Sequence, residues 1–454
     1  MIIDSGSRTS SEGEEASKGI LEQLLAPIAE VRGNEAKSGL LMALVMFLIL
    51  GAYYILKTAR EALILAEGGA AVKSYSAAGQ AFLLLFLVPA FAAFASRVNR
   101  IRLIRWVTLF FVTHLGLFFL AGESSLHIGI VYFLWVGIFN VMVIAQFWAF
   151  ANDLYTQEQG KRLFPLIGLG SSMGAWAGSV YAGRLIDRLG TFPLLLVAGG
   201  ILTFTVLIAQ LVHRSAARLL PREQAAMAEQ PLGKAGAFGL IRKDKYLLLI
   251  ATLTVLLNLV NTSGEYLFGR YVVEKANQAY GDGPESKAAR EEFIGETYSR
   301  FFSAVNLAGF LLQMFVVSRV FRFLGVGKAL FIHPVAAFIG YLTMARTPTM
   351  GEMYWLKVVD NSVDYSLGNT TKQALWLPTS REAKYKAKQA VDSFFMRAGD
   401  VVQAGVVFVG ERLLFTVSSF AVLNLFLAGG WLSVAGMLNL ALRRKARDAS
   451  AAEL

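Results

Sequence analysis

The chain has 454 residues, of which 55% are hydrophobic and only 17% are charged, and its mean hydropathy is +0.52. A water-soluble protein of this length does not have that balance, so lipid is expected to surround most of the chain. The formal net charge of +11 does not indicate nucleic-acid binding, because the Lys and Arg residues lie in short loops between apolar runs.

Catalytic and metal-binding motifs are absent from the sequence. It contains no cysteine, which excludes disulfides, a thiolate nucleophile and Cys-ligated zinc. The four histidines have no metal-ligand spacing, and no Ser/His/Asp arrangement is present; they are His114, His127, His213 and His333. We therefore expect no enzyme activity, no cofactor and no metal site.

The first 37 residues are polar, but apolar residues recur at helical spacing between positions 20 and 31. This pattern predicts a short amphipathic helix at the cytoplasmic interface, with packing against the helix bundle as the alternative.

Apolar runs of about twenty residues, long enough to cross a bilayer, follow from residue 38 onward. They predict about twelve transmembrane helices at 39–57, 75–95, 103–121, 127–150, 163–185, 192–212, 246–264, 298–318, 327–345, 352–376, 390–410 and 414–441.

The polar segments between these spans divide the chain into two sets of six. Residues 213–245 are basic and interrupted by proline, which predicts a cytoplasmic linker between a bundle at 38–212 and a bundle at 246–442. Lys and Arg crowd into every second loop and into the tail at 443–454. The positive-inside rule then predicts that both termini are cytoplasmic.

Charged residues close the first span, in the sequence YYILKTAREAL. Lys57, Arg60 and Glu61 lie on adjoining positions of one helix face. Charges inside a membrane cost several kcal/mol unless they are paired or face an aqueous cavity, so they mark a candidate functional site. The alternative is that Lys57 and Arg60 extend to the membrane interface.

Span ten carries a longer polar stripe, in the sequence MYWLKVVDNSVDYSLGNTTKQALW. Lys357, Asp360, Asp364, Gly368 and Lys372 recur every three or four positions and are expected to share one face. This face cannot contact acyl chains, because unpartnered polar groups find no water there. It is expected to line a cavity, with a structural salt-bridge network as the alternative. Other polar residues of the span are Asn361, Ser366, Asn369, Thr370 and Thr371.

Asn261 and Glu265 at the end of span seven are further polar candidates, and Asp392 in span eleven is expected to form a structural pair with Arg397 or Asp400.

Span five is rich in glycine, in the sequence FPLIGLGSSMGAWAGSVYAG. The spacing fits neither phosphate-binding glycine motif. Small residues every four positions instead predict close or sliding helix contacts. The glycines are Gly168, Gly170, Gly174 and Gly178.

Three segments resemble the ATP/ADP translocase family of plastids and obligate intracellular bacteria. They are YYILKTAREALIL, QFWAFANDLYTQEQGKRLFPLIGLGSSMG and DYSLGNTTKQALWLPTSREAKYKAKQAVD. The resemblance implies a major-facilitator-like, twelve-helix fold and a nucleotide cargo. Family lysines tied to nucleotide transport match Lys57 and Lys372. Two functionally important family acids instead fall on Val136 and Asn261, and Glu265, one turn after Asn261, is the candidate substitute for the second acid.

Together these patterns predict an all-α polytopic membrane protein of the bacterial inner membrane that transports nucleotides by alternating access. Lys57 and Lys372 are predicted to bind phosphate, with Arg60, Lys357 and Asn369 beside them. Asp360 and Asp364 are predicted to hold Lys357 and Lys372 in place or to carry a coupling proton; Glu265 and Asn261 complete the coupling group. The alternatives are a carrier of another anionic metabolite or lysolipid, and a membrane scaffold without transport activity.

Overall fold

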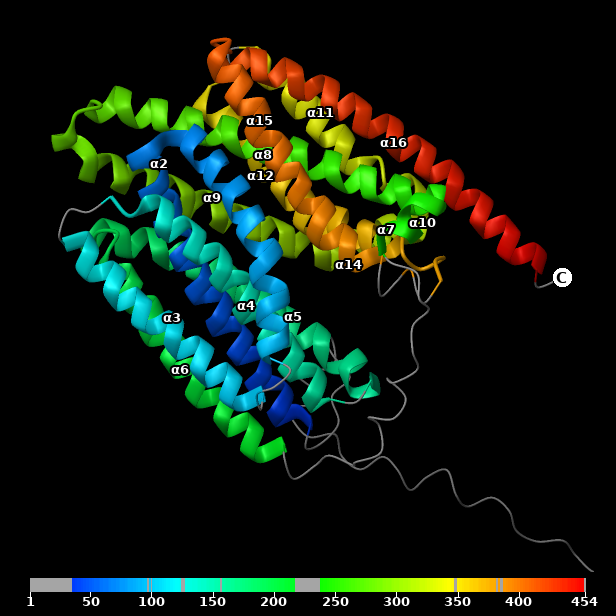
Figure 1. Cartoon of the computed structure of the whole chain (residues 1–454), viewed down its shortest axis with the longest axis horizontal. Helices are drawn as coiled ribbons and strands as arrows, with labels where there is room; N and C mark the ends of the chain where they lie inside the picture. Colours follow the sequence, from blue (N-terminus) through cyan, green and yellow to red (C-terminus); the bar gives the residue numbers. More distant parts are fainter. Residues whose placement is uncertain are drawn as a thin grey trace, which may run out of the picture.

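The computed structural model describes residues 35–95, 98, 100–123, 127–155, 157–216, 237–346, 349–380, 383 and 387–452. All the regular elements in these ranges are helices (Figure 1). The predicted amphipathic helix at 20–31 and residues 217–236 of the predicted linker lie outside the described residues.

The first group of helices comprises α2 (Glu35–Ala95), α3 (Arg100–Glu123), α4 (Gly129–Leu154), α5 (Gln157–Leu189) and α6 (Pro193–Ala216). Helix α2 is too long to cross a bilayer once, because its apolar stretch Lys37–Phe91 has 55 residues and about 20 residues suffice. It reverses direction at Gly69, whose φ of 71° lies in a region that glycine enters without steric cost. Helix α2 therefore contains both of the first two predicted spans.

The second group begins with α7 (Ala237–Lys243), which falls inside the predicted linker, and continues with α8 (Lys245–Tyr280). After a short 3₁₀ turn η2 (Pro284–Ser286) come α9 (Lys287–Phe315), α10 (Val317–Ala329) and α11 (Ile332–Met344). Span ten consists of α12 (Met350–Val363), the π-helical turn η3 (Asp364–Gly368) and α13 (Asn369–Ala374). Span eleven is α14 (Lys388–Ala390), the π-helical turn η5 (Val391–Phe395) and α15 (Met396–Arg412), and span twelve is α16 (Val417–Ala452).

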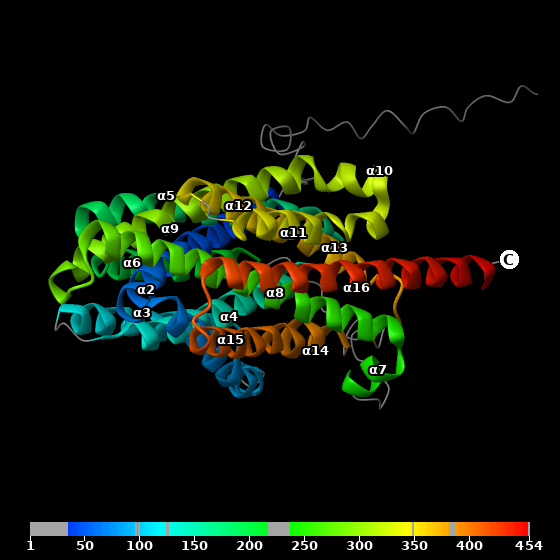
Figure 2. The ribbon, with the colours of Figure 1, turned by 90° about the horizontal axis from the view of Figure 1, so that it is seen from above.

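Each predicted span coincides with one or more of these helices, which confirms the all-α polytopic fold. Length and apolar composition alone identify seven membrane-crossing helices among the described residues, or eight when α9 and α10, bent by 73°, form one span. The later spans are harder to identify in this way because turns and π-helical segments divide them. Figure 1 shows the first group on one side and the second group on the other, with α2 and α9 where they meet. Seen from above in Figure 2, α16 lies beside α11 of the same group.

Helices α2 and α5 pack backbone to backbone along a seam of glycines. A Cβ atom on Gly174 would lie 2.1 Å from the carbonyl oxygen of Phe47, and a Cβ on Gly178 would lie 2.3 Å from that of Gly51. Gly170 meets the carbonyl of Ala43 in the same way. Only glycine permits this approach.

Gly168 lies outside this seam, because a Cβ atom there would meet nothing within 4 Å. It differs in this respect from the three glycines that follow it.

The two groups touch most closely at the end of the molecule where α2 reverses and α8 connects to α9. Glu67 lies 3.1 Å from Lys287 there, and Gln403 donates a hydrogen bond to Ser74 at 3.2 Å. Deeper in the molecule, Ser299 donates to the carbonyl of Ser179 at 2.6 Å. Figure 1 shows the ribbons of the two groups diverging toward the opposite end.

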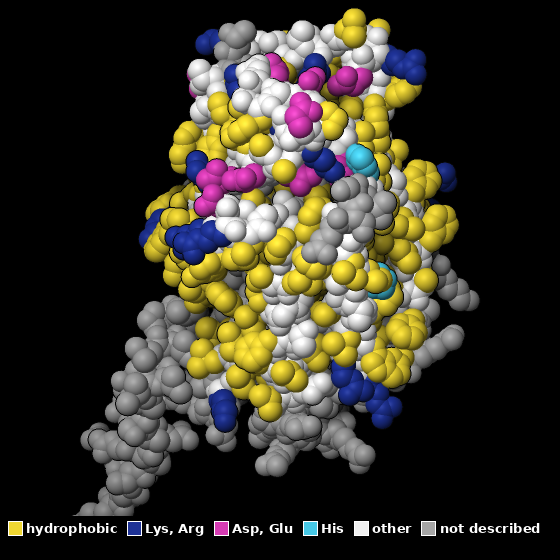
Figure 3. Space-filling view, turned by 90° about the vertical axis from the view of Figure 1, so that its left-hand side faces the viewer, with side chains coloured by type: hydrophobic (Ala, Val, Ile, Leu, Met, Phe, Trp, Pro, Cys, Tyr) yellow, Lys and Arg dark blue, Asp and Glu magenta, His cyan; other side chains and the backbone are white. Residues whose placement is uncertain are grey.

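The end where the groups meet carries both acidic and basic side chains on its surface (Figure 3). The segment joining α8 to α9 contributes the exposed residues Asp282 and Glu285 to it.

Candidate functional site

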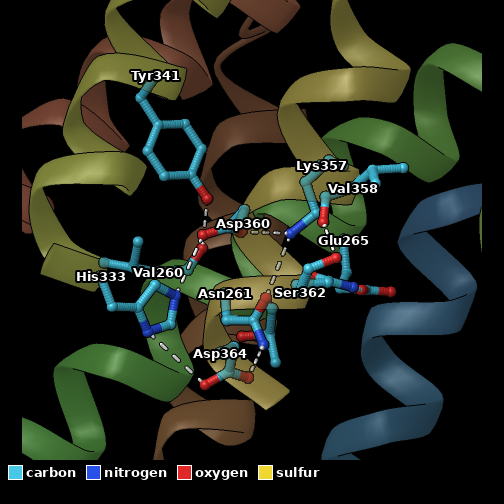
Figure 4. A network of polar contacts seen from close by, with 12 residues as sticks. Val260, Asn261, Glu265, His333, Tyr341, Lys357, Val358, Asp360, Ser362 and Asp364 are labelled. Atoms are coloured by element: carbon cyan, nitrogen blue, oxygen red, sulfur yellow. Dashed lines mark hydrogen bonds and ion pairs between the residues drawn. The ribbon is translucent and has the colours of Figure 1, made fainter. Parts of the chain in front are cut away.

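A buried ion pair lies at the centre of span ten. The Nζ atom of Lys357 is 2.8 Å from the Oδ2 atom of Asp360 and donates to the Oδ1 atom of Asn261 at 3.2 Å. The Lys357 side chain is only 1% exposed. Because the two residues of the pair lie three positions apart on α12, the helix itself brings them together (Figure 4).

A histidine on α11 joins this pair to the next carboxylate along the chain. The Nε2 atom of His333 lies 3.3 Å from the Oδ1 atom of Asp360, and its Nδ1 atom lies 3.7 Å from the Oδ1 atom of Asp364. Asn261 donates to the other oxygen of Asp364 at 3.3 Å. Residues from α8, α11, α12 and η3 therefore form one polar network (Figure 4).

Lys372 does not join the carboxylates that the one-face prediction assigned to it. It lies eight residues after Asp364, which is about 12 Å along a regular helix, and the π-helical turn at 364–368 lies between them. Lys372 instead lines a small cavity with His333, Gly368 and Trp431. Asn369, just after the turn, is exposed.

A second cluster of charges lies on α2, on both sides of its reversal. Arg60 pairs with the neighbouring Glu61, and the guanidinium also lies over the ring of Phe133 at 4.6 Å. Lys73 lies 2.7 Å from the other oxygen of Glu61. Glu61 is buried, with 1% of its side chain exposed, so two cations compensate one buried carboxylate.

Glu265 on α8 connects the two clusters. Its Oε2 atom lies 3.6 Å from Lys73 of the first group, and its Oε1 atom accepts a hydrogen bond from Asn361 at 2.8 Å. The polar residues predicted on spans one, seven and ten thus form a nearly continuous chain across the interface.

Lys57 and Lys372 stand out because, among the described residues, neither has a carboxylate partner. Lys57 is partly buried and lies over the aromatic rings of Phe302 at 4.1 Å and Tyr54 at 5.1 Å. Lys372 is partly buried beside His333. Arg60 and Lys357 differ from them, because a neighbouring carboxylate neutralises each of these charges.

The sequence interpretation missed two members of the site, Lys73 and His333. Lys73 lies just before the predicted start of span two and therefore outside the predicted spans, although α2 is helical on both sides of Gly69. His333 lies in an apolar span. The principle that an ionisable residue inside a membrane span marks a candidate site, which identified the charges of span ten, was sufficient to find His333 as well.

Two further predictions concern spans four and eleven. In span eleven the pair forms between Arg397 and Asp400 at 3.1 Å, not with Asp392 as predicted, and Asn258 donates to Asp400 at 2.7 Å. Val136, where a family acid is missing, is fully buried in the hydrophobic core, so a carboxylate there would face apolar neighbours.

No cluster of three or more His, Asp or Glu side chains suited to a metal ion occurs within the described ranges.

Comparison with known proteins shows distant similarity to nucleotide carriers. The ADP,ATP carrier protein 1 of Chlamydia pneumoniae is 24% identical over 347 residues, covering 66% of this chain and 64% of the carrier. ADP,ATP carrier protein 4 of Rickettsia bellii is 25% identical over 312 residues, covering 57% and 55%. The plastidic ATP/ADP-transporter of Solanum tuberosum is 23% identical over 340 residues, covering 66% and 51%. The chain thus spans less than two thirds of the length of these relatives. No family model matches it.

Solved structures share the fold at low sequence identity. The nucleoside transporter NupG superposes with a TM-score of 0.59 at 13% identity, covering 88% of this chain and 98% of NupG. The peptide transporter POT in complex with sulfate gives 0.62 at 13%, covering 94% and 99%. A bacterial homologue of the human lysosomal transporter Spinster, in an inward-facing conformation, gives 0.59 at 12%, covering 91% and 98%. The chain therefore has a major-facilitator-like fold and distant homologues among ADP,ATP carriers, as the sequence predicted.

Proposed function

We propose that this chain is a secondary transporter that moves a nucleotide across a membrane by alternating access. One observation carries the proposal. In the part of the chain that the structure describes, Lys57 and Lys372 have no carboxylate partner, whereas the surrounding cations Arg60, Lys73 and Lys357 do. A charge left unpaired inside a membrane protein is costly, so it is retained where an anionic ligand completes it. A nucleotide supplies several phosphate charges, which suits cations from both groups of helices.

The distribution of contacts between the groups supports the alternating-access part of the proposal. The groups meet through Glu67 with Lys287, Lys73 with Glu265 and Ser299 with Ser179, while their ribbons diverge at the other end (Figure 1). Rocking one bundle against the other would break this set of contacts and form another. Residues 38–212 and 246–442 are the proposed moving bundles.

The distribution of Lys and Arg supports the proposed orientation. They crowd into every second loop, which supports cytoplasmic termini if the membrane is the inner membrane of a bacterium. The names of the relatives support nucleotide as the cargo. Asn261 stands where the ATP/ADP translocase family has an acidic residue. Because the Asn261 amide carries no charge, this difference favours the alternative in which the cargo is a different anion.

Uptake of labelled ATP into proteoliposomes, preloaded with ADP, phosphate or buffer, tests the proposal. We expect saturable uptake by the wild type and a loss of about tenfold or more for Lys57→Ala or Lys372→Ala, because a charge-assisted contact contributes about 1.5–3 kcal/mol. Lys445→Ala is the matched control, since Lys445 pairs with Asp244 at 3.2 Å away from the site.

Three results would contradict parts of the proposal. Absence of saturable ATP uptake by folded wild type overturns the nucleotide assignment, and uptake of other labelled organic anions then identifies the cargo class. Uptake that survives both lysine substitutions overturns the site. A scaffold without transport activity predicts that folded wild type takes up no labelled solute in a saturable way and that Lys372→Ala only lowers thermal stability.

A further inference from the structure

His333 is buried between two carboxylates, and helix packing alone does not require this arrangement. Its ring is buried, with 3% of the residue exposed, yet it lies between the carboxylates of Asp360 and Asp364. The Nδ1 atom has no hydrogen-bond partner. A Cβ atom on Gly368 would approach this nitrogen to 2.9 Å, so the glycine leaves space for the ring.

Among the described residues, one of the two carboxylates beside His333 has no Lys or Arg within ion-pair distance. From α12, Asp360 faces the ring but pairs with Lys357 at 2.8 Å. From η3, Asp364 has only the Asn261 amide at 3.3 Å and the imidazole at 3.7 Å. Within the described residues, no Lys or Arg forms an ion pair with Asp364.

The other neighbours of the ring add one positive charge. Helix α16 contributes the uncharged Trp431, whose ring centroid lies 4.8 Å from that of His333. From α11 itself, the hydroxyl of Tyr341 is committed to the carbonyl of Val260 at 2.6 Å. From α13, Lys372 lines the same small cavity as the imidazole. Its volume of about 20 Å³ is room for one water molecule.

We propose that His333, together with Asp364, binds the proton that accompanies the anion, so that the protein is a proton–anion symporter. This inference rests on the proposed function, in which Lys372 binds the anion. With no anion, the charges of Lys357, Lys372, Asp360 and Asp364 cancel, and a neutral imidazole leaves the cluster neutral. When an anion takes up the charge of Lys372, one negative charge is left over. A proton on the Nδ1 atom of His333 then restores neutrality.

The coupling follows from this charge balance. Anion binding favours the protonated imidazole, and a bound proton favours the anion by the same factor, because the linkage is reciprocal. One N–H bond forms with a proton from water on the side where the site is open. The same bond breaks after the bundles have rocked, and the proton returns to water on the other side.

A pH gradient across proteoliposomes tests the inference, with the membrane potential held at zero by potassium and valinomycin. If one proton accompanies each anion, an acidic exterior of one pH unit raises the accumulation ratio of labelled ATP about tenfold. A protonophore is expected to abolish that rise. Addition of ATP to unloaded vesicles is expected to make the medium more alkaline.

Variants at the site make the test specific. In His333→Gln and in Asp364→Asn, uptake with the pH gradient is expected to equal uptake without it, so that the ratio of the two falls to about one. The control is His114→Gln, a helical histidine of the first group whose Nδ1 atom contacts the Phe110 carbonyl at 2.7 Å. It is expected to keep the wild-type ratio. Asp364→Asn keeps the shape of the side chain, which guards against a variant that does not fold.

The outcomes separate this inference from the proposed function. Counterflow of labelled ATP against preloaded ATP needs no net proton movement. Wild type that shows counterflow but no response to the gradient overturns the symport inference and leaves nucleotide transport standing. A gradient response that persists in folded His333→Gln and Asp364→Asn places the proton elsewhere and also overturns it. Wild type without counterflow overturns the proposed function.

Discussion

The ammonium group of Lys73 lies 3.6 Å from the carboxylate of Glu265, and this ion pair joins the two groups of helices inside the protein. Lys73 is also 2.7 Å from Glu61 on its own helix and 5.3 Å from the ring of Tyr298. One buried cation therefore holds together carboxylates from both bundles. This pair must separate if the closed end is to open, which makes it the most direct place to test the proposed motion.

Lys73→Met is expected to favour opening of the closed end. It leaves Glu61 and Glu265 as two carboxylates without this cation, and the lost contact contributes about 1.5–3 kcal/mol. The open population should rise about tenfold or more. Because the chain has no cysteine, a single cysteine at Ala70, which is buried near Gly269, reports opening through its rate of labelling by a membrane-impermeant maleimide.

Arg300→Met is the control for this measurement, because Arg300 pairs with Glu296 on the surface of a single helix. It should leave the labelling rate of Ala70→Cys near that of the wild type. Equal labelling rates in the Lys73→Met and Arg300→Met backgrounds would show that the Lys73 contact does not restrain opening.

Glu67 at the reversal of α2 is predicted to stabilise the same closed end through two contacts. It accepts a hydrogen bond from the backbone N–H of Gly129 at 2.7 Å, at the start of α4, and it lies 3.1 Å from Lys287. Glu67→Gln keeps the shape but loses the charge that favours a helix N-terminus, which is worth about 0.3–1 kcal/mol. A small decrease in the midpoint of thermal unfolding in detergent is expected.

A double-mutant cycle with Lys287→Met isolates the second contact of Glu67. Lys287 is 29% exposed, so solvent screens the pair and the coupling energy should not exceed about 1 kcal/mol. A cycle energy well above this value would mean that the contact is better shielded than its exposure indicates.

The glycine seam between α2 and α5 predicts a sharp contrast between neighbouring substitutions. Gly174→Ala places a methyl group 2.1 Å from the carbonyl oxygen of Phe47, and overpacking of this kind costs about 1–3 kcal/mol. Gly168→Ala meets open space and gains helix propensity, so it should be neutral or stabilising. Thermal unfolding of the two variants in the same detergent makes the comparison, and equal destabilisation would contradict a tight seam at Gly174.

The helical spans could be predicted because a bilayer imposes a simple length and composition on each of them. The charges of spans one and ten were found by the same physics, since their burial is costly wherever they are placed. Which charge pairs with which partner was not predictable, because it depends on tertiary contacts. The pair between Lys73 and Glu265 joins residues almost two hundred positions apart, and the turn at Gly69 that brings Lys73 back is a single residue with an unusual φ.

The partner of Asp364 is the largest difference between expectation and structure. The spacing along span ten placed Lys372 on the same polar face as the carboxylates. Lys372 lies eight positions after Asp364, however, which is about 12 Å along a regular helix, and the described residues show no ion pair between them. Asp364 instead faces His333 at 3.7 Å. Because His333 comes from another helix, the pattern of span ten could not predict this contact.

The buried pair of Lys357 and Asp360 provides the last prediction. Its atoms are 2.8 Å apart, and the lysine is 1% exposed, so removal of one partner leaves an uncompensated charge. Asp360→Asn alone should destabilise the protein by about 3–5 kcal/mol, and Lys357→Met with Asp360→Asn should cost much less, because no lone charge remains. Thermal unfolding of the single and double variants measures the difference. A double variant as unstable as the sum of its singles would mean that the two charges do not stabilise each other, and that Asn261 and His333 hold them independently.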